Sequence, residues 1–211
     1  MTVDLIKPVK SARKAKGDGH LRRAEILHAA ERIFVRDGYQ GATIRKIADE
    51  VGVSSTALYM HFRDKDEILL EICEGAIAAL LASNTEISGR PIDAVSRVRL
   101  MLEAYMWFGL NNPNTYQLAF CAPQVESVKD RADAVEDLAH RCYQTFKGAV
   151  ADIAAEGRLR VGDVSSAAQT LWCACHGLVA LRIGRPGVEW EANDTLISVL
   201  LDSLFQGLAA A

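Results

Sequence analysis

The 211-residue sequence lacks both a membrane-spanning run and an alternating polar and apolar segment long enough for a strand. Its longest nearly apolar run, from Leu171 to Leu181, is shorter than the roughly 20 residues that a spanning helix needs, and His176 interrupts it. The positive charges near the N-terminus are not followed by the apolar stretch of a secretory signal. Ala, Leu, Ile and Val instead recur with helical spacing, so we expect a cytoplasmic, all-α protein with no membrane partner.

The sequence also lacks the patterns that mark common catalytic sites. It contains no glycine-rich phosphate loop, no serine elbow and no pair of carboxylates at a credible spacing. The histidines His61, His140 and His176 have no acidic partner or nucleophile near them in the sequence. We therefore expect that the protein is not an enzyme and needs no cofactor.

Cysteine is scarce and odd in number, with five residues, so a disulfide framework is not indicated. Without an export signal, reduced thiols are expected. Cys173, Cys175 and His176 suggest a metal site, but residues two apart on a helix point about 200° apart, so the two thiols cannot face one ion. Cys173 and His176 alone are too few ligands. We expect no metal site and keep thiol-based redox sensing as an alternative.

Residues 43–69 predict two short helices at a tight turn, followed by the start of a third helix. Thr43 is placed to cap the first helix and Ser54 to cap the second, while Gly52 supplies the turn. A small residue at Ala48 and a flexible one at Gly52 allow the two helices to cross closely. This geometry lets the second helix project into the major groove of DNA.

The third helix of this segment is expected to be long and to connect two parts of the protein. Asp64 and Glu67 form the acid pair that is typical of a capped helix start. An apolar face then continues to about residue 82. A preceding helix at residues 20–37, which we expect to end at Gly38 in the left-handed conformation, packs across both short helices.

Positive charge is unevenly distributed along a chain whose net charge is only −3. Residues 1–66 hold 13 Lys or Arg and nine Asp or Glu, whereas residues 67–211 hold 11 and 18. A basic head on an acidic body is expected when one end contacts phosphate, although an uneven solvated surface gives the same counts. Residues 1–19 indicate a disordered basic arm, either touching DNA or without consequence for it.

The motif resembles the TetR family of bacterial transcriptional repressors. The matching positions are Gly38-Tyr39, Thr43, Ile47-Ala48, Gly52-Val53-Ser54, Leu58-Tyr59, His61-Phe62 and Lys65. Where many members have Gly-Thr after the serine pair, this chain has Thr56-Ala57. The resemblance implies an N-terminal three-helix, helix-turn-helix head and a C-terminal helical domain. We therefore expect a disordered arm at 1–19, a DNA-binding domain at 20–66 and an effector-binding and dimerisation domain at 67–211.

The resemblance also implies which residues contact double-stranded operator DNA. We expect base contacts from Ser55, Thr56 and Ala57 at the start of the second short helix, the last through a thymine methyl. The other candidates, which match contacting or capping positions of the family, are Thr43, Arg45, Ser54, Tyr59, His61 and Lys65. Among these, Arg45 is expected to reach a guanine and Lys65 to hold a phosphate near a helix N-terminus.

Apolar and aromatic residues concentrate on one face of each predicted body helix. Such residues are usually core, but an apolar cavity with a few polar tips also suits a small hydrophobic or aromatic effector. Trp172, His176 and Gly177 resemble the Trp-His-Gly signature of one subgroup of the family, and Trp172 shares a helix face with His176. His176 can equally be a core histidine. The predicted ligand-binding residues are Met101, Tyr105, Phe108, Phe120, Cys142, Phe146, Trp172 and His176.

The last two predicted helices, residues 163–182 and 193–208, are apolar nearly all round, whereas a surface helix needs only one apolar stripe. We expect a second copy of the chain to cover the surplus in a two-fold, four-helix interface, as the resemblance also implies. A buried central helix in a monomer is the alternative. Two heads of a homodimer then reach successive major grooves of a near-palindromic operator.

These expectations combine into a ligand-responsive repressor that a small hydrophobic or aromatic effector releases from DNA. The effector is expected to bias the tilt of the helix at residues 65–82 through its different affinity for two states. An efflux or catabolic target gene follows by family analogy alone. The alternatives are a ligand-independent DNA-binding protein and a thiol-based redox-sensing regulator.

Overall fold

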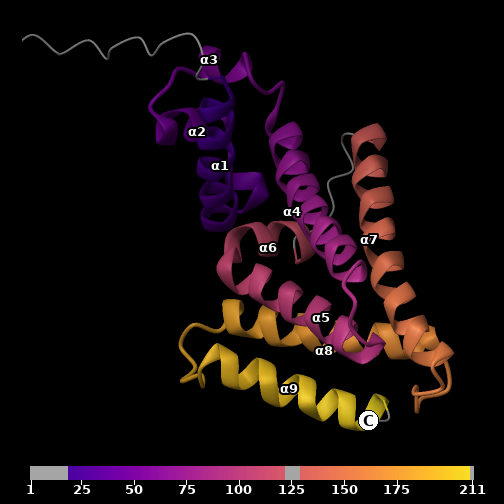
Figure 1. Cartoon of the computed structure of the whole chain (residues 1–211). Helices are drawn as coiled ribbons and strands as arrows, with labels where there is room; N and C mark the ends of the chain where they lie inside the picture. The colour runs from indigo at the N-terminus through magenta and orange to yellow at the C-terminus, as the bar shows by residue number, and fades with distance from the viewer. Residues whose placement is uncertain (1–18, 122–128, 210–211) are drawn as a thin grey trace, which may run out of the picture.

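The computed structural model describes residues 19–121 and 129–209, which fold into helices joined by short turns (Figure 1). Nearly all of the arm predicted at residues 1–19 lies outside these described residues. Within the described ranges, strand-like pairing is limited to one bridge between Leu159 and Ala209, and the all-α prediction is confirmed. The described helices are α1 (Gly19–Gly41), α2 (Ile44–Val51), α3 (Ser55–Tyr59), α4 (Lys65–Ser88), α5 (Ala94–Asn111), α6 (Pro113–Phe120), α7 (Lys129–Ala155), α8 (Val164–Gly184) and α9 (Asn193–Leu208).

The head is formed by α1, α2, α3 and the first turns of α4 around one apolar core (Figure 1). Its buried members are Ile26, Ala29, Ala30, Ile33, Phe34, Ala42, Ile47, Ala48, Leu58, Phe62, Ile68, Leu69, Ile72 and Leu118. Ile68, Leu69 and Ile72 belong to α4, so the core of the head continues past residue 66. Leu118 comes from α6, which brings a body helix against the head.

Side-chain caps start the helices of the head where the sequence predicts them. The Thr43 hydroxyl accepts from the Lys46 N–H at 3.2 Å, and the Ser54 hydroxyl accepts from the Ala57 N–H at 3.1 Å. The Asp64 carboxylate accepts from the Glu67 N–H at 2.8 Å. Each cap satisfies a backbone donor that the first turn of a helix leaves without a partner. These three predicted helix starts are confirmed.

The end of α1 differs from the prediction at Gly38. This residue has a positive φ of 71° but a ψ of 164°, which is not the left-handed helical conformation expected there. The chain then makes a further helical turn to Gly41, and the Ala42 N–H donates to the Gly38 carbonyl at 3.1 Å. The left-handed conformation occurs instead at Gly52, with φ 73° and ψ 35°, where it turns the chain from α2 to α3.

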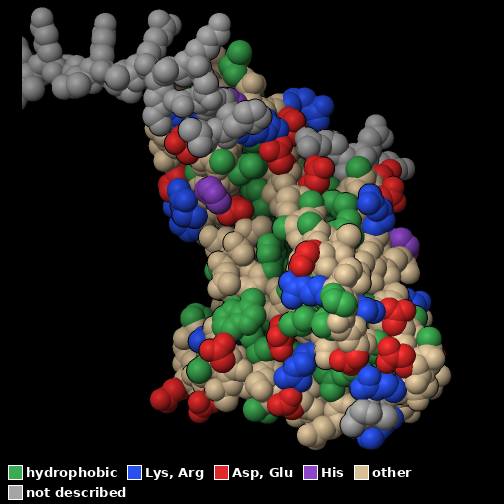
Figure 2. All heavy atoms as spheres, in the orientation of Figure 1, with side chains coloured by type: hydrophobic (Ala, Val, Ile, Leu, Met, Phe, Trp, Pro, Cys, Tyr) green, Lys and Arg blue, Asp and Glu red, His purple; other side chains and the backbone are tan. Residues whose placement is uncertain are grey.

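The body is built from α4 to α9, with α8 and α9 at the end opposite the head (Figure 1). α4 packs along α7, α5 packs on both α7 and α8, and α9 lies against α8 and α5. The short helix α6 contacts α1, α4 and α5, so it fills the corner between head and body. Figure 2 shows acidic and basic side chains interspersed on one face of the body, where the acidic excess forms no single patch.

Two of the described helices, α4 and α8, are long and apolar enough to cross a membrane by length and composition alone, with mean hydropathies of 1.4 and 1.2. A core helix of a water-soluble protein meets the same criterion. For α4 the apolar content has a clear structural use, because this helix supplies Ile68, Leu69 and Ile72 to the head core and Ile87 to the body core.

Gly109 lies where α5 closely approaches α6 and α8 in the body. A β-carbon at this position would lie 2.5 Å from Val179 Cγ1 and 2.7 Å from Tyr116 Cδ2, both shorter than real contacts allow. We therefore expect Gly109→Ala to lower the free energy of unfolding by about 1–3 kcal/mol through overpacking. Chemical denaturation followed by circular dichroism measures this change.

The matched control is Gly148→Ala on α7, where a β-carbon meets nothing within 4 Å. The same substitution there is expected to stabilise the protein by about 0.5–1 kcal/mol, because alanine favours the helix interior. Equal effects at the two positions would contradict the close packing of α5, α6 and α8.

Candidate DNA-binding face and effector cavity

The short helix α3 presents an open face beside a single buried anchor. Leu58 is fully buried in the head core and holds the helix in place. Thr56 and Ala57 are exposed, and Tyr59 and Met60 are 55% and 82% exposed. Ser55, the other predicted base-reading residue, is half-buried. The exposed face therefore includes Met60, an apolar side chain that the sequence prediction missed.

Among the other predicted DNA-binding residues, some side chains are exposed to solvent and others form hydrogen bonds within the protein. The hydroxyls of Thr43 and Ser54 accept backbone hydrogen bonds as caps, so they position helices. The side chain of Arg45 is 87% exposed and lies 3.9 Å from the Asp49 carboxylate, a distance at which an exposed pair contributes little. His61 is half-buried, and its carbonyl oxygen accepts a hydrogen bond from Arg23.

Lys65 is half-buried and bonds to the head in this structure, although the sequence suggested a phosphate contact. Its ammonium group donates to the carbonyl oxygens of Tyr39 at 2.8 Å and Ala42 at 3.3 Å, and sits 4.0 Å from the centre of the Tyr39 ring. The Tyr39 hydroxyl in turn bonds to Asp66 in the first turn of α4. Lys65 thus ties the segment between α1 and α2 to the start of α4.

Arg23 makes a second tie between α1 and α4 that the sequence analysis did not identify. Its guanidinium forms a two-pronged pair with the Glu71 carboxylate, including a 2.7 Å bond from Nε, and lies 4.0 Å from the centre of the Phe62 ring. The hydrogen bond to Glu71 raises the pKa of Arg23 above its ordinary value. Such planar, paired contacts fix direction as well as distance, so the start of α4 is held to the head.

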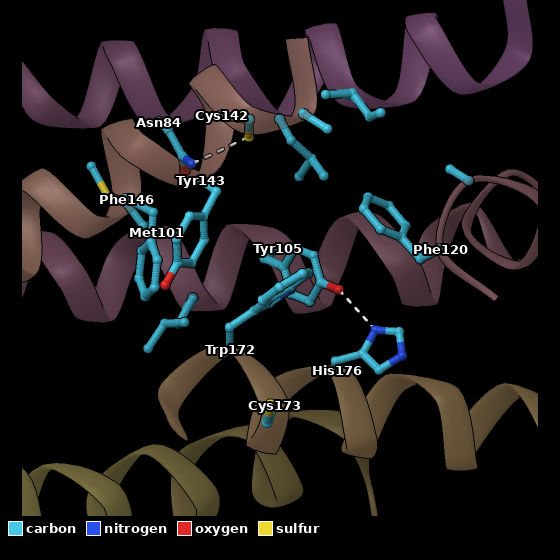
Figure 3. Close-up of a pocket in the computed structure, with 15 residues that line it drawn as sticks. Asn84, Met101, Tyr105, Phe120, Cys142, Tyr143, Phe146, Trp172, Cys173 and His176 are labelled. Atoms are coloured by element: carbon cyan, nitrogen blue, oxygen red, sulfur yellow. Dashed lines mark hydrogen bonds between the residues drawn. The ribbon is translucent and has the colours of Figure 1, made fainter. Parts of the chain in front are cut away.

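A largely apolar cavity of about 440 Å³ opens in the body between α4, α5, α6, α7 and α8 (Figure 3). This volume is in the range of small-molecule sites. The residues that line it are Ile77, Leu80, Asn84, Met101, Leu102, Tyr105, Ala119, Phe120, Ala139, Cys142, Tyr143, Phe146, Trp172, Cys173 and His176. All but one of the predicted ligand-binding residues are among them.

Phe108 is the exception, because it does not line the cavity. It lies nearly one turn beyond Tyr105 and is half-buried against the core of the body. At this end of α5, Tyr116 and Val179 crowd Gly109, so α6 and α8 close over the helix. Helical spacing alone placed Phe108 on the same face as Tyr105 but gave no information on where the cavity ends.

The sequence prediction also left out the cavity wall that α4 contributes. Ile77 and Leu80 were assigned only to an apolar helix face, and Asn84 carried no signal in the sequence. All three line the cavity, and the Asn84 amide lies 3.7 Å from the Cys142 sulfur on α7. An apolar stripe has the same pattern whether it faces core atoms or an empty space, so sequence periodicity cannot separate the two.

Three polar side chains meet on the α6 side of the cavity, around His176, whereas Asn84 and Tyr143 lie toward its other end (Figure 3). The hydroxyls of Tyr116 and Tyr105 lie 2.7 Å and 3.1 Å from His176 Nδ1, and 2.9 Å from each other. Figure 3 shows Tyr105 and His176 directed toward one another from α5 and α8. We call these three residues the polar triad. Tyr105 and His176 line the cavity, whereas Tyr116 is buried behind them.

Burial keeps the polar triad uncharged near neutral pH. It lowers the pKa of His176 below its ordinary value of 6.5. Burial also raises the pKa of Tyr105 to about 12, against hydrogen bonds with Tyr116 and Trp172 that lower it. The pKa of Tyr116 is raised by burial as well. In a weakly polar surrounding the neutral form of each group is favoured.

The cysteines do not form a site together. Cys175 is buried, which raises the pKa of its thiol to about 12, whereas Cys173 is exposed and lines the cavity. The two side chains point in nearly opposite directions, because residues two apart on a helix are separated by about 200° around its axis. Over the described ranges, no group of three or more His, Cys, Asp or Glu is placed to hold a metal ion.

Two family profiles together cover most of the described chain. The profile for bacterial regulatory proteins of the tetR family matches residues 26–72, and that for the tetracyclin repressor-like C-terminal domain matches residues 98–204. The chain belongs to the TetR family. Its members are DNA-binding regulators and not enzymes, so the expectations of a DNA-binding regulator and of no enzymatic activity are confirmed.

Relatives of this chain include both activators and repressors. The HTH-type transcriptional activator FasR of Mycolicibacterium smegmatis is 32% identical over 148 residues, which are 62% of this chain and 68% of that protein. The HTH-type transcriptional repressor AcnR of Corynebacterium diphtheriae is 39% identical over 67 residues, 30% of this chain and 35% of that protein.

Solved structures of the family share the fold. The TetR family regulator PfmR from Thermus thermophilus matches with a TM-score of 0.76 at 22% identity, over 86% of this chain and 97% of that one. The ketosteroid transcriptional regulator KstR2 of Mycobacterium tuberculosis matches with a TM-score of 0.74 at 22% identity, over 90% of this chain and 96% of that one. The Trp-His-Gly subgroup assignment of Trp172, His176 and Gly177 stays a prediction.

The Tyr143 hydroxyl provides a test of the cavity's packing. This oxygen is enclosed and has no hydrogen-bond partner among the described residues. Because an unsatisfied buried group costs about 1–3 kcal/mol, we expect Tyr143→Phe to stabilise the protein by about 1 kcal/mol. In a protein of this size, that corresponds to a rise in Tm of roughly 2–4 °C in a thermal unfolding scan.

Tyr116→Phe is the matched control for this experiment. It also removes one hydroxyl, but this one bonds to His176 at 2.7 Å and to Tyr105 at 2.9 Å. Its loss is expected to lower the free energy of unfolding by about 1 kcal/mol. If both variants lowered Tm alike, the contrast between a free and a bonded hydroxyl would be wrong.

Proposed function

We propose that this chain is a ligand-responsive transcriptional regulator that binds a near-palindromic operator as a homodimer and is released by a small hydrophobic or aromatic effector. The observation that carries the proposal is that α4 belongs both to the head core, through Ile68 and Ile72, and to the cavity wall, through Ile77 and Leu80. A molecule that fills the cavity therefore touches the helix on which the DNA-binding head is built.

The exposed face of α3 supports a division of roles among the proposed DNA contacts. Ser55, Thr56 and Ala57 are proposed to read base edges in the major groove. The exposed side chains of Arg45 and Tyr59, together with the half-buried His61, are proposed to contact bases or phosphates from the flanks. Thr43 and Ser54 position the two short helices, and Lys65 contributes to DNA binding mainly by holding α4 to the head.

The outer face of α8 and α9 supports the proposed homodimer. Leu181 on α8 and Val199 on α9 are 54% and 60% exposed, although both are large and apolar. A β-carbon at Gly177 would meet no atom within 4 Å, so nothing in the described part of the chain accounts for a glycine in the middle of α8. A second copy of the chain packed closely at this point, as in family dimers, accounts for all three observations.

A second connection between cavity and head runs through α6. On this helix Tyr116 bonds to His176 and Phe120 lines the cavity, while Leu118 lies in the head core. The Thr115 hydroxyl also donates to the Glu31 carboxylate of α1 at 2.9 Å. Movement of α6 on effector binding is therefore proposed to reach α1 directly, in addition to the path along α4.

The protein is proposed to repress its target gene, which is proposed to encode an efflux or catabolic function. Its proposed location is the cytoplasm. The open cavity favours this reading over a ligand-independent DNA-binding protein, whose body has no need of an internal space. The redox alternative depends on Cys173, the exposed thiol in the cavity wall. Loss of oxidant sensitivity in Cys173→Ser, with ligand response absent, would favour that alternative.

Fluorescence anisotropy tests the proposed function directly. Labelled duplex DNA from around the protein's own gene is titrated at two salt concentrations beside scrambled DNA of the same composition. A regulator keeps its preference for the specific duplex at the higher salt, whereas purely electrostatic binding weakens equally on both. Equal, salt-sensitive binding to every duplex from the gene's surroundings would count against specific recognition there.

Tyr59→Ala and Thr56→Ala distinguish contacts to the DNA backbone from contacts to the bases. Tyr59→Ala is expected to weaken binding to specific and scrambled DNA by a similar factor, because contacts to the backbone carry no sequence information. Thr56→Ala is expected to change the ranking of operator variants by about 1–3 kcal/mol at one base pair. The same anisotropy titration measures both, and identical effects on scrambled DNA would contradict the division of roles.

Thr115→Val tests the connection through α6. The variant keeps the shape of the side chain but removes the hydrogen bond to Glu31. We expect a several-fold smaller change in DNA affinity at saturating effector, with the affinity of the effector-free protein nearly unchanged. Thr145→Val on α7 is the control, since its hydroxyl donates to the Arg141 carbonyl within the same helix. Equal coupling in Thr115→Val and wild type would remove α6 from the mechanism.

A further inference from the structure

The cavity combines apolar walls with a lining that carries no formal charge over the described residues. Of the described residues that line it, none is Asp, Glu, Lys or Arg. The amide of Asn84 already faces the Cys142 sulfur at 3.7 Å. The Tyr143 hydroxyl is enclosed by its neighbours. Tyr105 and His176, with Tyr116 behind them, are therefore the main hydrogen-bonding groups that an occupant meets.

We propose that the cavity selects an uncharged ligand with an apolar body and a single hydroxyl or carbonyl group, which hydrogen-bonds to the Tyr105 hydroxyl of the polar triad. The inference rests on the proposed function only in naming this ligand as the effector. It excludes free carboxylates and cations as preferred occupants, although both could have a body of suitable shape.

The exclusion of charge follows from what the lining can offer. An ionised group that leaves water needs an opposite charge or several hydrogen bonds, since burial without them costs several kcal/mol or more. No opposite charge is present among the lining residues that the structure describes. Burial lowers the pKa of His176, so the imidazole is neutral at pH 7.5 and does not supply a positive charge for a carboxylate.

The preference for one polar group follows from the hydrogens of the triad. His176 Nδ1 has a single site, so it makes one strong bond, and Tyr116 is the nearer partner at 2.7 Å. Nδ1 and the Tyr116 hydroxyl satisfy each other in either tautomer of His176, since an unprotonated Nδ1 accepts from the hydroxyl and a protonated one donates to it. With Tyr116 bonded to His176, the Tyr105 hydroxyl can turn its hydrogen toward a ligand carbonyl, or accept one from a ligand hydroxyl.

Three probes with one biphenyl body test this selection in the full-length protein without DNA. They are 4-phenylphenol, 4-methylbiphenyl and biphenyl-4-carboxylate, and calorimetric titration at pH 7.5 gives their affinities. The phenol is expected to bind at least roughly tenfold more tightly than the carboxylate, because the charge has no partner. It is expected to bind roughly 3- to 10-fold more tightly than the methyl compound, which makes no hydrogen bond.

Tyr105→Phe identifies the group responsible. This variant is expected to remove the preference for the phenol over 4-methylbiphenyl while keeping the affinity for 4-methylbiphenyl, which also shows that the cavity is still formed. Tyr39→Phe in the head removes a tyrosine hydroxyl outside the cavity and serves as the control with wild-type ranking. Binding of the carboxylate as tight as that of the phenol, equal binding of phenol and methyl compound, or binding of none of the probes would overturn the proposal.

Operator binding measured in parallel separates this inference from the proposed function. If the probes bind in the expected order but leave DNA affinity unchanged, the ligand class stands and effector control of DNA binding fails. If specific DNA binding is released by the carboxylate in preference to the phenol, ligand-responsive regulation stands and the ligand class is wrong.

Discussion

The structure depends on one helix being held at both of its ends. α4 is capped by Asp64 and tied to α1 by the Arg23–Glu71 pair and by Lys65, so its first turns move with the head. Farther along, Ile77 and Leu80 form cavity wall and Ile87 lies in the body core. Because closely packed interiors transmit displacement and do not absorb it, a rigid element shared by two cores makes cavity and DNA-binding face parts of one mechanical system.

In the proposed mechanism, one face of the short helix α6 lies toward the ligand cavity and another face contacts the head. α6 directs Tyr116 and Phe120 toward the cavity side, whereas Thr115 and Leu118 contact the head. This division follows from helical geometry, in which residues four apart share a face and intermediate ones do not. Tyr116 of the polar triad therefore lies on the segment that also contacts the head.

Local chemistry in the sequence was sufficient to predict the head, while the extent of the cavity required the folded chain. Caps at Thr43, Ser54 and Asp64 depend on neighbours three residues away, so they are readable from sequence spacing. The cavity boundary that excludes Phe108 depends on α6 and α8 closing around Gly109, contacts between residues distant in the chain. For the same reason, the Arg23–Glu71 pair and the inward position of Lys65 had no sequence signature.

The Arg23–Glu71 pair also sets where the chain can be divided. A head transplanted with a junction after residue 66 would keep Arg23 but lose Glu71, together with Ile68, Leu69 and Ile72 of its own core. The DNA-binding domain thus extends almost two turns into α4. It ends at about residue 72, where the family profile of the head also ends. Exchange of sensing bodies between related regulators is least disruptive beyond that turn, where α4 lines the cavity and packs within the body.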